Sequence, residues 1–354
     1  MDRARRKDEH IYYSMCYAPQ KADFSDVALI HNCLPDLNFN RVNMETAYMG
    51  RTFRSPLFIN AVTGGTKLGL RINALLAGVA RRFGLPMAVG SQMAALESRA
   101  SETSFKVVRR INPDGAIWAN IGSYADPDLV LRAVKMIRAD AVQIHLNAAQ
   151  ELIMSDGDRA FEGMVSRIEK IVKTAGVPVI VKEVGFGMAR EQAAVLCRAG
   201  VSAVDTGGRG GTNFLAIESR RAGVNLSPGL KTWGIPTAIS IIEAASVLSG
   251  KTALFASGGI YDALDIAKAL ALGARAVGLA GYPLYCLLRE GQSALVEKIE
   301  NIETELRIIM MLTGAGTVTE LQTRPLVITG YTAEWMKRRG LNPDLYARRP
   351  GDSN

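Results

Sequence analysis

From residue 56 onward the chain repeats one pattern, in which a short apolar segment is followed by a stretch with helical spacing. Eight apolar segments have the length of buried strands; they cover residues 56–61, 86–90 and 115–119, a segment that begins at Ala141, and residues 177–181, 202–204, 252–256 and 275–279. Residues 70–80 have the spacing of an amphipathic helix, and another helix is expected to begin near Pro127, with Asp126 as its N-cap. This alternation predicts an α/β fold, the (β/α)8 or TIM barrel.

A doubly wound open sheet is the competing architecture. Such a sheet is expected to carry a glycine-rich dinucleotide turn after its first strand, and Val62-Thr-Gly-Gly65 lacks the G-x-G-x-x-G spacing. We therefore predict one barrel domain over residues 1–354. Residues 1–55 would form an N-terminal extension, residues 56–284 the barrel, and residues 285–354 extra C-terminal helices and a polar tail.

Charge and cysteine content narrow the class of function. The net charge is +8, but only Arg3 to Lys7 form a dense basic run, so an extended nucleic-acid groove is poorly supported. The four cysteines are widely separated and form no CxxC pair, which disfavours a zinc site and fits a reducing cytoplasm. No apolar run approaches the roughly 18 residues of a membrane span, and no apolar core of a signal peptide follows the basic N-terminus. We expect a cytoplasmic protein that binds neither nucleic acid nor membrane.

Polar residues gather where the predicted strands end. The densest group follows the strand that begins at Ala141 and consists of His145, Asn147, Gln150 and Glu151. Each of these groups would cost about 1–3 kcal/mol if it were buried without a partner. Taken alone, the group could be a satisfied hydrogen-bond cluster or a ligand site. Barrel enzymes place their chemistry at the C-terminal ends of the strands, so the one-sided pattern favours an active site.

Glycines follow the seventh and eighth strands. Ser257-Gly-Gly-Ile260 and Ala280-Gly281 each precede a helical stretch, the first of them running from Tyr261 to Leu272. Loops at these positions form the common phosphate site of the fold, where backbone N–H groups and helix N-termini face the anion. The loop Thr206–Thr212 is a further glycine-rich element and suggests a segment that covers a ligand. Lys182, at the mouth of the fifth strand, must reach water or meet an anion.

Several segments, in order along the chain, resemble the type 2 isopentenyl-diphosphate delta-isomerases, which depend on flavin. The matching segments are Arg6-Lys-Asp-Glu-His-Ile11, Ala61-Val-Thr-Gly-Gly65, Val89-Gly-Ser-Gln92, Asn120-Ile-Gly122, His145-Leu-Asn-Ala-Ala-Gln-Glu151, Val181–Gly187, Asp205–Thr212, Trp233–Thr237, Ala256–Ile260 and Ala280-Gly281. Many flavin barrels share the Gly-Gly turns, whereas the His-Leu-Asn-x-x-Gln-Glu segment together with the N-terminal Arg-Lys is far more specific.

The resemblance implies FMN, Mg²⁺ and a small-molecule C5 isoprenoid diphosphate as substrate. By carry-over, the residues that would contact FMN or its phosphate are Ala61, Val62, Thr63, Ser91, Asn120, Lys182, Thr212, Gly258, Gly259, Ala280 and Gly281. Arg6 and Lys7 would hold the diphosphate, and His145, Asn147 and Gln150 would line the substrate pocket. Glu151 would bind Mg²⁺, which typically uses one or two carboxylates plus substrate phosphates and waters.

The implied reaction converts isopentenyl diphosphate to dimethylallyl diphosphate in isoprenoid biosynthesis. Because no second carboxylate lies beside Glu151, the protons are expected to come from reduced FMN, at N5, and no protein side chain is assigned as the acid or base. A proton-transfer and a radical route both stay open. NADPH would serve only to reduce FMN. Some members carry arginine where this chain has Met93, and Arg99 is a candidate replacement. We also expect a homo-oligomer.

Three other functions fit the sequence less well. An FMN-dependent 2-hydroxy-acid oxidase needs a histidine base and paired arginines, but His145 is the only barrel histidine and has no arginine nearby in the sequence. An enzyme resembling IMP dehydrogenase would want a cysteine in the loop Thr206–Thr212, which has none. A non-catalytic RNA binder would be colourless and would show steeply salt-dependent binding.

Overall fold

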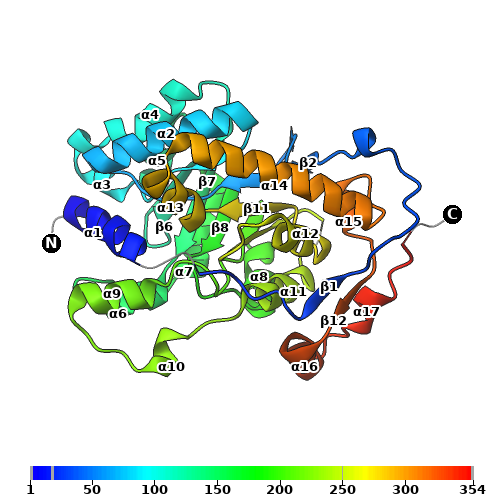
Figure 1. The fold of residues 1–354 in the computed structure, drawn as a ribbon. Helices are drawn as coiled ribbons and strands as arrows, with labels where there is room; N and C mark the ends of the chain where they lie inside the picture. Colours follow the sequence, from blue (N-terminus) through cyan, green and yellow to red (C-terminus); the bar gives the residue numbers. More distant parts are fainter. Residues whose placement is uncertain (1–2, 17–19, 249, 352–354) are drawn as a thin grey trace.

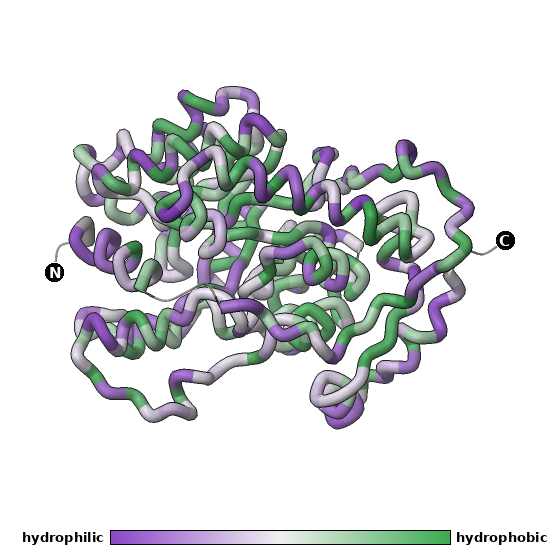
Figure 2. The backbone as a smooth tube through the Cα atoms, in the orientation of Figure 1, coloured by the Kyte–Doolittle hydropathy of each residue, from purple (hydrophilic) through white to green (hydrophobic). Residues whose placement is uncertain are grey.

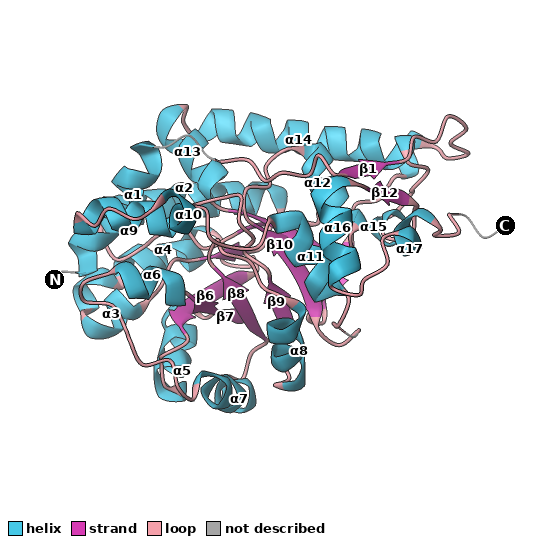
Figure 3. Ribbon diagram, turned by 90° about the horizontal axis from the view of Figure 1, so that it is seen from below, coloured by secondary structure: helices cyan, strands magenta, loops and turns pink. Residues whose placement is uncertain are grey.

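Eight parallel strands close into a barrel, as predicted (Figures 1 and 3). The computed structural model describes residues 3–16, 20–248 and 250–351. The strands pair in the order β10-β11-β4-β5-β6-β7-β8-β9. Their bounds are β4 Leu57–Ile59, β5 Met87–Ala88, β6 Ile117–Gly122, β7 Ala141–Leu146, β8 Val179–Glu183, β9 Ala203–Asp205, β10 Ala253–Ser257 and β11 Ala276–Leu279.

Three strands extend further than their apolar residues indicate. β6 includes Asn120, β7 includes His145 and β8 includes Lys182, although the predicted strands β6 and β8 stop before these polar residues. Each of the three side chains lines a cavity at the open end of the barrel. The ladder continues beneath them, since Asn120 is paired with Gln143 and His145 with Lys182.

Helices surround the barrel, and the longer ones are α2 Lys67–Phe83, α4 Thr103–Ile111, α5 Pro127–Ile137, α7 Met164–Thr174, α8 Arg190–Arg198, α11 Thr237–Ala245, α12 Ala263–Ala271, α13 Gly281–Arg289 and α14 Gln292–Leu312. The helix predicted over 70–80 lies inside α2, and α12 is two residues shorter at its start than predicted. α5 begins at Pro127 as expected, but the Asp126 side chain makes no capping hydrogen bond. The short helices α3 Met93–Glu97, α6 Ala148–Ile153 and α10 Pro228–Lys231, and the nine-residue α9 Phe214–Ala222, lie in loops that follow strands.

The barrel interior has an aromatic layer and, above it, a polar layer. Phe58, Trp118 and Phe255 pack against one another in the aromatic layer, with ring centroids 5.0–5.8 Å apart. Two residues further along the same strands, Asn60, Asn120 and Ser257 form part of the polar layer; the alternation of side chains along a strand points all of these residues inward. The apolar side chains between them, such as Ile59 and Ala119, point to the other side of the sheet and pack against the helices. Apolar side chains therefore fill the lower part of the barrel, and polar side chains lie at the C-terminal ends of the strands.

The N-terminal residues contribute to both ends of the barrel. Helix α1 (Arg3–Cys16) lies beside α9 and α13 and is largely hydrophilic in Figure 2. The hairpin of β2 (Thr46–Tyr48) and β3 (Arg51–Phe53) inserts the rings of Tyr48 and Phe53 beneath the aromatic layer, with Tyr48 4.8 Å from Phe255. This hairpin closes the lower end of the barrel, so a ligand must enter at the other end.

The two terminal segments meet in a separate ribbon, in which β1 (Val27–Leu29) pairs antiparallel with β12 (Leu326–Ile328). α15 Val318–Leu321, α16 Gly330–Arg338 and α17 Asp344–Ala347 complete the expected C-terminal helices. Residues 352–354 of the predicted polar tail lie outside the described residues. The single-domain boundaries stay a prediction. In the part of the chain that the structure describes, no helix has the length and apolar character needed to cross a bilayer.

Candidate active site

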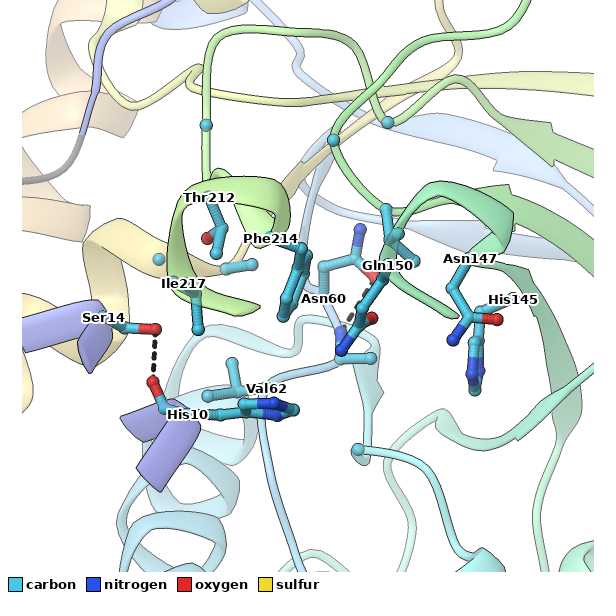
Figure 4. Close-up of a pocket in the computed structure, with 18 of the residues that line it drawn as sticks. His10, Ser14, Asn60, Val62, His145, Asn147, Gln150, Thr212, Phe214 and Ile217 are labelled. Carbon is cyan, nitrogen blue, oxygen red and sulfur yellow. Dashed lines mark hydrogen bonds between the residues drawn. The ribbon is translucent and has the colours of Figure 1, made fainter. Parts of the chain in front are cut away.

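A cavity of about 350 Å³ opens at the C-terminal ends of the strands. Loops after all eight strands contribute to its wall, and α1 adds side chains that include Arg6, Lys7 and His10. Figure 4 shows side chains from these elements converging on one space, among them His10, Val62, His145 and Gln150. The polar strand ends and the basic N-terminal segment, which are far apart in the sequence, therefore belong to one site.

Every residue assigned to a ligand in the sequence analysis lines this cavity. The assigned residues are Arg6, Lys7, Ala61, Val62, Thr63, Ser91, Asn120, His145, Asn147, Gln150, Glu151, Lys182, Thr212, Gly258, Gly259, Ala280 and Gly281. Met93 lines it too. Arg99 is not among the lining residues and is exposed on the 3-10 helix Arg99–Ser101, so it does not replace the arginine absent at Met93. The structure brings these residues together, whereas their individual roles stay predictions.

One corner of the cavity, formed by Gly258, Gly259 and Gly281 and called the glycine corner below, presents free backbone donors. In the described part of the chain, the N–H groups of Gly258, Gly259 and Gly281 have no acceptor. Gly281 is the first residue of α13, whose N-terminal dipole favours an anion. The loop 206–212 packs directly on this corner, since a Cβ on Gly258 would lie 2.1 Å from the carbonyl oxygen of Gly208. Such a set of donors could hold an anion such as a phosphate.

Two further groups fit a bound flavin. The Thr63 hydroxyl lines the cavity, is buried and has no partner within the described residues, so it is free to bond to a ligand. Lys182 is buried at the mouth of β8, where its Nζ donates to the carbonyl oxygen of Glu183 at 2.8 Å. An ammonium group buried among few charges favours a ligand that carries negative charge.

The carboxylate of Glu151 is held at the start of α6. Its Oε1 accepts a hydrogen bond from Asn147 Nδ2 at 2.7 Å, and its Oε2 accepts one from the backbone N–H of Asp158 at 2.9 Å. Among the described residues, no group of three or more His, Cys, Asp and Glu side chains could hold a metal by itself. A lone carboxylate fits Mg²⁺, which completes its shell with phosphate oxygens and water, and does not fit a structural zinc site.

His145 is neutral at ordinary pH. Burial, together with the positive charges of Lys182 and Lys7, lowers the pKa of the imidazole to about 3. Its Nδ1 lies 2.9 Å from Oδ1 of Asn120. Lys7 itself donates from Nζ to the carbonyl oxygen of Ser91 and lies 4.9 Å from the centre of the Phe105 ring.

A buried ion cluster that the sequence analysis did not assign fastens α1 over the cavity. Glu218 on α9 accepts hydrogen bonds from His10 Nε2 at 2.6 Å, Gln150 Nε2 at 3.0 Å and Arg221 Nε at 2.7 Å. Burial alone would raise the pKa of Glu218, but these donors lower it to about 2. Arg221 also pairs with Glu9 of α1 at 3.6 Å. α1 and α9 are therefore joined by charge as well as by packing.

The position of α1 corrects one argument made from the sequence. The oxidase alternative was disfavoured because His145 is the only histidine of the barrel and no arginine lies near it in the chain. In the structure, α1 brings His10 and Arg6 into the same cavity, so that argument was incomplete. The sequence did contain a signal, because His10 is part of the segment Arg6–Ile11 used for the family resemblance.

Comparison with known proteins gives a consistent result. The sequence profile of the family described as FMN-dependent dehydrogenase matches residues 145–328, which is just over half of the chain. The isopentenyl-diphosphate delta-isomerase of Moorella thermoacetica is 50% identical over 337 residues, covering 95% of this chain and 97% of that protein. The isopentenyl-diphosphate delta-isomerase of a Geobacillus species is 48% identical over 351 residues, covering 99% of this chain and 100% of that protein.

Solved structures agree on the fold. A mandelate oxidase bound to 3,3-difluoro-2-hydroxy-3-phenylpropionic acid has a TM-score of 0.67 at 18% sequence identity, covering 92% of this chain and 97% of that one. A mandelate oxidase variant bound to (S)-mandelic acid has a TM-score of 0.66 at 19% identity, covering 92% and 96% of the two chains. At such identities the likeness concerns the barrel architecture alone.

Proposed function

The chain belongs to the isopentenyl-diphosphate delta-isomerase family, and from that membership we propose that it converts isopentenyl diphosphate to dimethylallyl diphosphate with FMN as its cofactor. The observation that carries this function is one cavity that combines a glycine corner suited to a phosphate, the basic pair Arg6 and Lys7, and the carboxylate of Glu151. A 2-hydroxy-acid oxidase would bind its substrate carboxylate through basic residues and would have no use for a carboxylate that binds a metal, so the presence of Glu151 supports the isomerase.

FMN fits the residues that are present. Gly258, Gly259 and Gly281 would donate N–H groups to its phosphate, next to Thr212 and Ala280, and Asn120 and Ser91 would contact the rest of the cofactor. Thr63, with its orphaned hydroxyl, and the adjacent Ala61 and Val62 would contact the ring system after β4. When bound and reduced, FMN supplies the acid and base that the allylic double-bond shift requires. Lys182 would stabilise negative charge on the reduced cofactor, and burial of the site would exclude water from it.

The substrate diphosphate fits the part of the cavity beneath α1. Arg6 and Lys7 would neutralise it, and Glu151 would hold the Mg²⁺ that bridges to its oxygens. Asn147 keeps the Glu151 carboxylate oriented through its hydrogen bond. The Glu218 cluster would fasten α1 in the arrangement that places Arg6 and Lys7 at the cavity. His145, Asn147 and Gln150 would complete the substrate pocket.

Further parts of the proposal concern the setting of the enzyme. NADPH would serve only to reduce FMN. The double-bond shift itself involves no net redox change and therefore consumes no reductant. We place the enzyme in isoprenoid biosynthesis in the cytoplasm and expect it to act as a homo-oligomer.

The function is tested with purified, FMN-loaded protein, isopentenyl diphosphate and Mg²⁺, once with NADPH under anaerobic conditions and once with oxidised FMN. We expect dimethylallyl diphosphate to form only in the reduced sample and to require Mg²⁺. Equal turnover by the oxidised enzyme would refute the role of reduced FMN. Hydrogen peroxide release from 2-hydroxy acids, without isomerisation, would instead establish the oxidase alternative.

A further inference from the structure

Beneath the cavity, a chain of hydrogen bonds crosses the barrel and ends at His145. Asn60 Nδ2 donates to Asp205 Oδ2 at 2.7 Å, and Gln143 Nε2 donates to Asn60 Oδ1 at 3.0 Å. Asn120 Nδ2 then donates to Gln143 Oε1 at 2.9 Å, and Asn120 Oδ1 lies 2.9 Å from His145 Nδ1. We call these five side chains the barrel relay. Asp205, Asn60, Gln143 and Asn120 are all buried, so water does not compete for these bonds.

The orientation of the side-chain amides in the barrel relay is set at Asp205, the end opposite His145. Asp205 offers only acceptor oxygens when ionised, and its Oδ1 already accepts from Ser257 Oγ at 2.6 Å. Asn60 must therefore turn its amide nitrogen towards Asp205. The backbone N–H of Ala61 fixes the same orientation independently, because it donates to Asn60 Oδ1 at 2.8 Å.

Each following amide then has one orientation that pairs donor with acceptor. With Asn60 Oδ1 as an acceptor, Gln143 must present Nε2 to it and Oε1 to Asn120. Asn120 must in turn present Nδ2 to Gln143 and Oδ1 to His145. A carbonyl oxygen cannot bond to a ring nitrogen that lacks hydrogen, so Nδ1 of His145 carries the proton.

We propose that Gln143, Asn60 and Asp205 are positioning residues of the isomerase site, which hold His145 as the Nδ1–H tautomer so that its Nε2 presents a lone pair to the bound ligands. His145 lines the cavity, and its Nε2 has no partner within the described residues. When the ligands are bound, Nε2 would accept a hydrogen bond from a donor that they supply, either a flavin N–H or a water held by the metal. His145 therefore does not donate to the diphosphate, and that contact falls to Arg6 and Lys7. The identity of the ligands rests on the proposed function, whereas the tautomer does not.

The tautomer can be read from the imidazole nitrogens of protein labelled with ¹⁵N-histidine. The chain has three histidines, and a His145→Gln sample assigns the signals of His145. At pH 7 we expect Nδ1 to be protonated and Nε2 unprotonated in the FMN-loaded protein. A protonated Nε2 in that sample would overturn the proposal. Because no substrate is present, this measurement is independent of whether the protein is an isomerase.

Gln143→Met breaks the relay while keeping the length and volume of the side chain. We expect a mixture of His145 tautomers and a fall in kcat of about 10-fold or more, with the dissociation constant for FMN within about 3-fold of the wild type. Gln92→Met is the matched control. Gln92 is equally buried. Its Oε1 accepts a hydrogen bond from the backbone N–H of Asn120 at 3.0 Å, and it does not bond to the side-chain amide of Asn120.

The control variant should keep the wild-type tautomer even if it loses stability. Tautomer mixing of the same extent in both variants, or a Gln143→Met variant with the wild-type tautomer and kcat, would overturn the positioning role. The donor to Nε2 is identified by adding FMN to the apoprotein and then Mg²⁺ with inorganic pyrophosphate. A shift of the Nε2 signal at the first addition assigns a flavin N–H, a shift only at the second assigns metal-bound water, and no shift at either contradicts a ligand role for Nε2.

Discussion

The substitution Gly259→Ala tests whether the glycine corner is shaped by the contact between two loops. Gly259 has φ +78°, and an added Cβ would lie 1.9 Å from the carbonyl oxygen of Gly210 and 2.7 Å from the backbone nitrogen of Ala22. Contacts of this kind below 3.0 Å are essentially never found for a real Cβ. Since both neighbours are backbone atoms, one of the loops must move by about 1 Å, and the N–H donors of the corner move with it.

The expected cost has two parts. The left-handed backbone of an alanine costs roughly 1–2 kcal/mol, which lowers the free energy of unfolding of the apoprotein. Displacement by about 1 Å weakens the hydrogen bonds to a phosphate, each worth roughly 1.5–3 kcal/mol for a charged acceptor. Loss of one such bond raises the dissociation constant for FMN by roughly 10-fold to 100-fold.

Gly163→Ala is the matched control, because Gly163 has φ +74° and no atom within 4 Å of an added Cβ. It precedes α7, on the outside of the barrel. Flavin fluorescence gives the FMN dissociation constant, and urea unfolding of the apoprotein gives the stability. Both variants should lose stability from the left-handed backbone, with a larger loss for Gly259→Ala because of its overlap with the neighbouring loops, and only Gly259→Ala should lose FMN affinity. Equal FMN affinity in Gly259→Ala and the wild type would refute the phosphate role of the corner.

Three further outcomes follow from the structure. Glu151→Gln should abolish most Mg²⁺-dependent isomerisation while leaving the FMN content unchanged, as measured by a Mg²⁺ titration and by flavin absorbance; loss of FMN would instead indicate a structural role. Glu218→Gln should cost about 3 kcal/mol at pH 7, because the pKa of the carboxyl group is near 2 in the folded state and 4.5 in its ordinary range. The difference from the wild type should shrink as the pH falls from about 4.5 towards 2 in urea unfolding, and a constant difference would contradict the assignment. Arg109→Met should cost roughly 3–5 kcal/mol, because buried Arg109 bonds to Asp140 at 2.6 Å and to four carbonyl groups, while an altered FMN affinity would contradict its location at the closed end.

Local sequence predicted the barrel because each strand and helix carries its own pattern. The segment at 56–61 and the helix at 70–80 were recognised from apolar spacing alone, and both lie where expected. The residues of the cavity wall were predicted from one rule, that barrel enzymes place their active site at the C-terminal ends of the strands. Residues such as Thr63 and Lys182, which come just after the apolar segments at 56–61 and 177–181, were therefore placed in the cavity wall.

Contacts between distant segments had no such local pattern. Glu218 belongs to a helix whose sequence shows ordinary charged residues, and only the docking of α1 places His10 2.6 Å from its carboxylate. Asn60 follows β4 and Asp205 ends β9. Four other strands lie between β4 and β9 in the chain, so this hydrogen bond depends on how the strands close around the barrel axis. The replacement proposed for the arginine absent at Met93 was wrong for the same reason, because sequence proximity does not turn Arg99 towards the cavity.

The β1–β12 ribbon has a consequence for the order in which the protein is completed. Its two strands lie near opposite ends of the chain, and Val27 pairs with Ile328. During synthesis, β1 leaves the ribosome long before its partner exists, so the ribbon forms only after nearly all of the barrel has been made. α1 precedes β1, but its partners α9 and α13 are made before β12, so α1 can dock on the barrel before the ribbon forms. The cavity, whose lining ends at Leu284, can therefore be complete before the two terminal segments are joined by the ribbon.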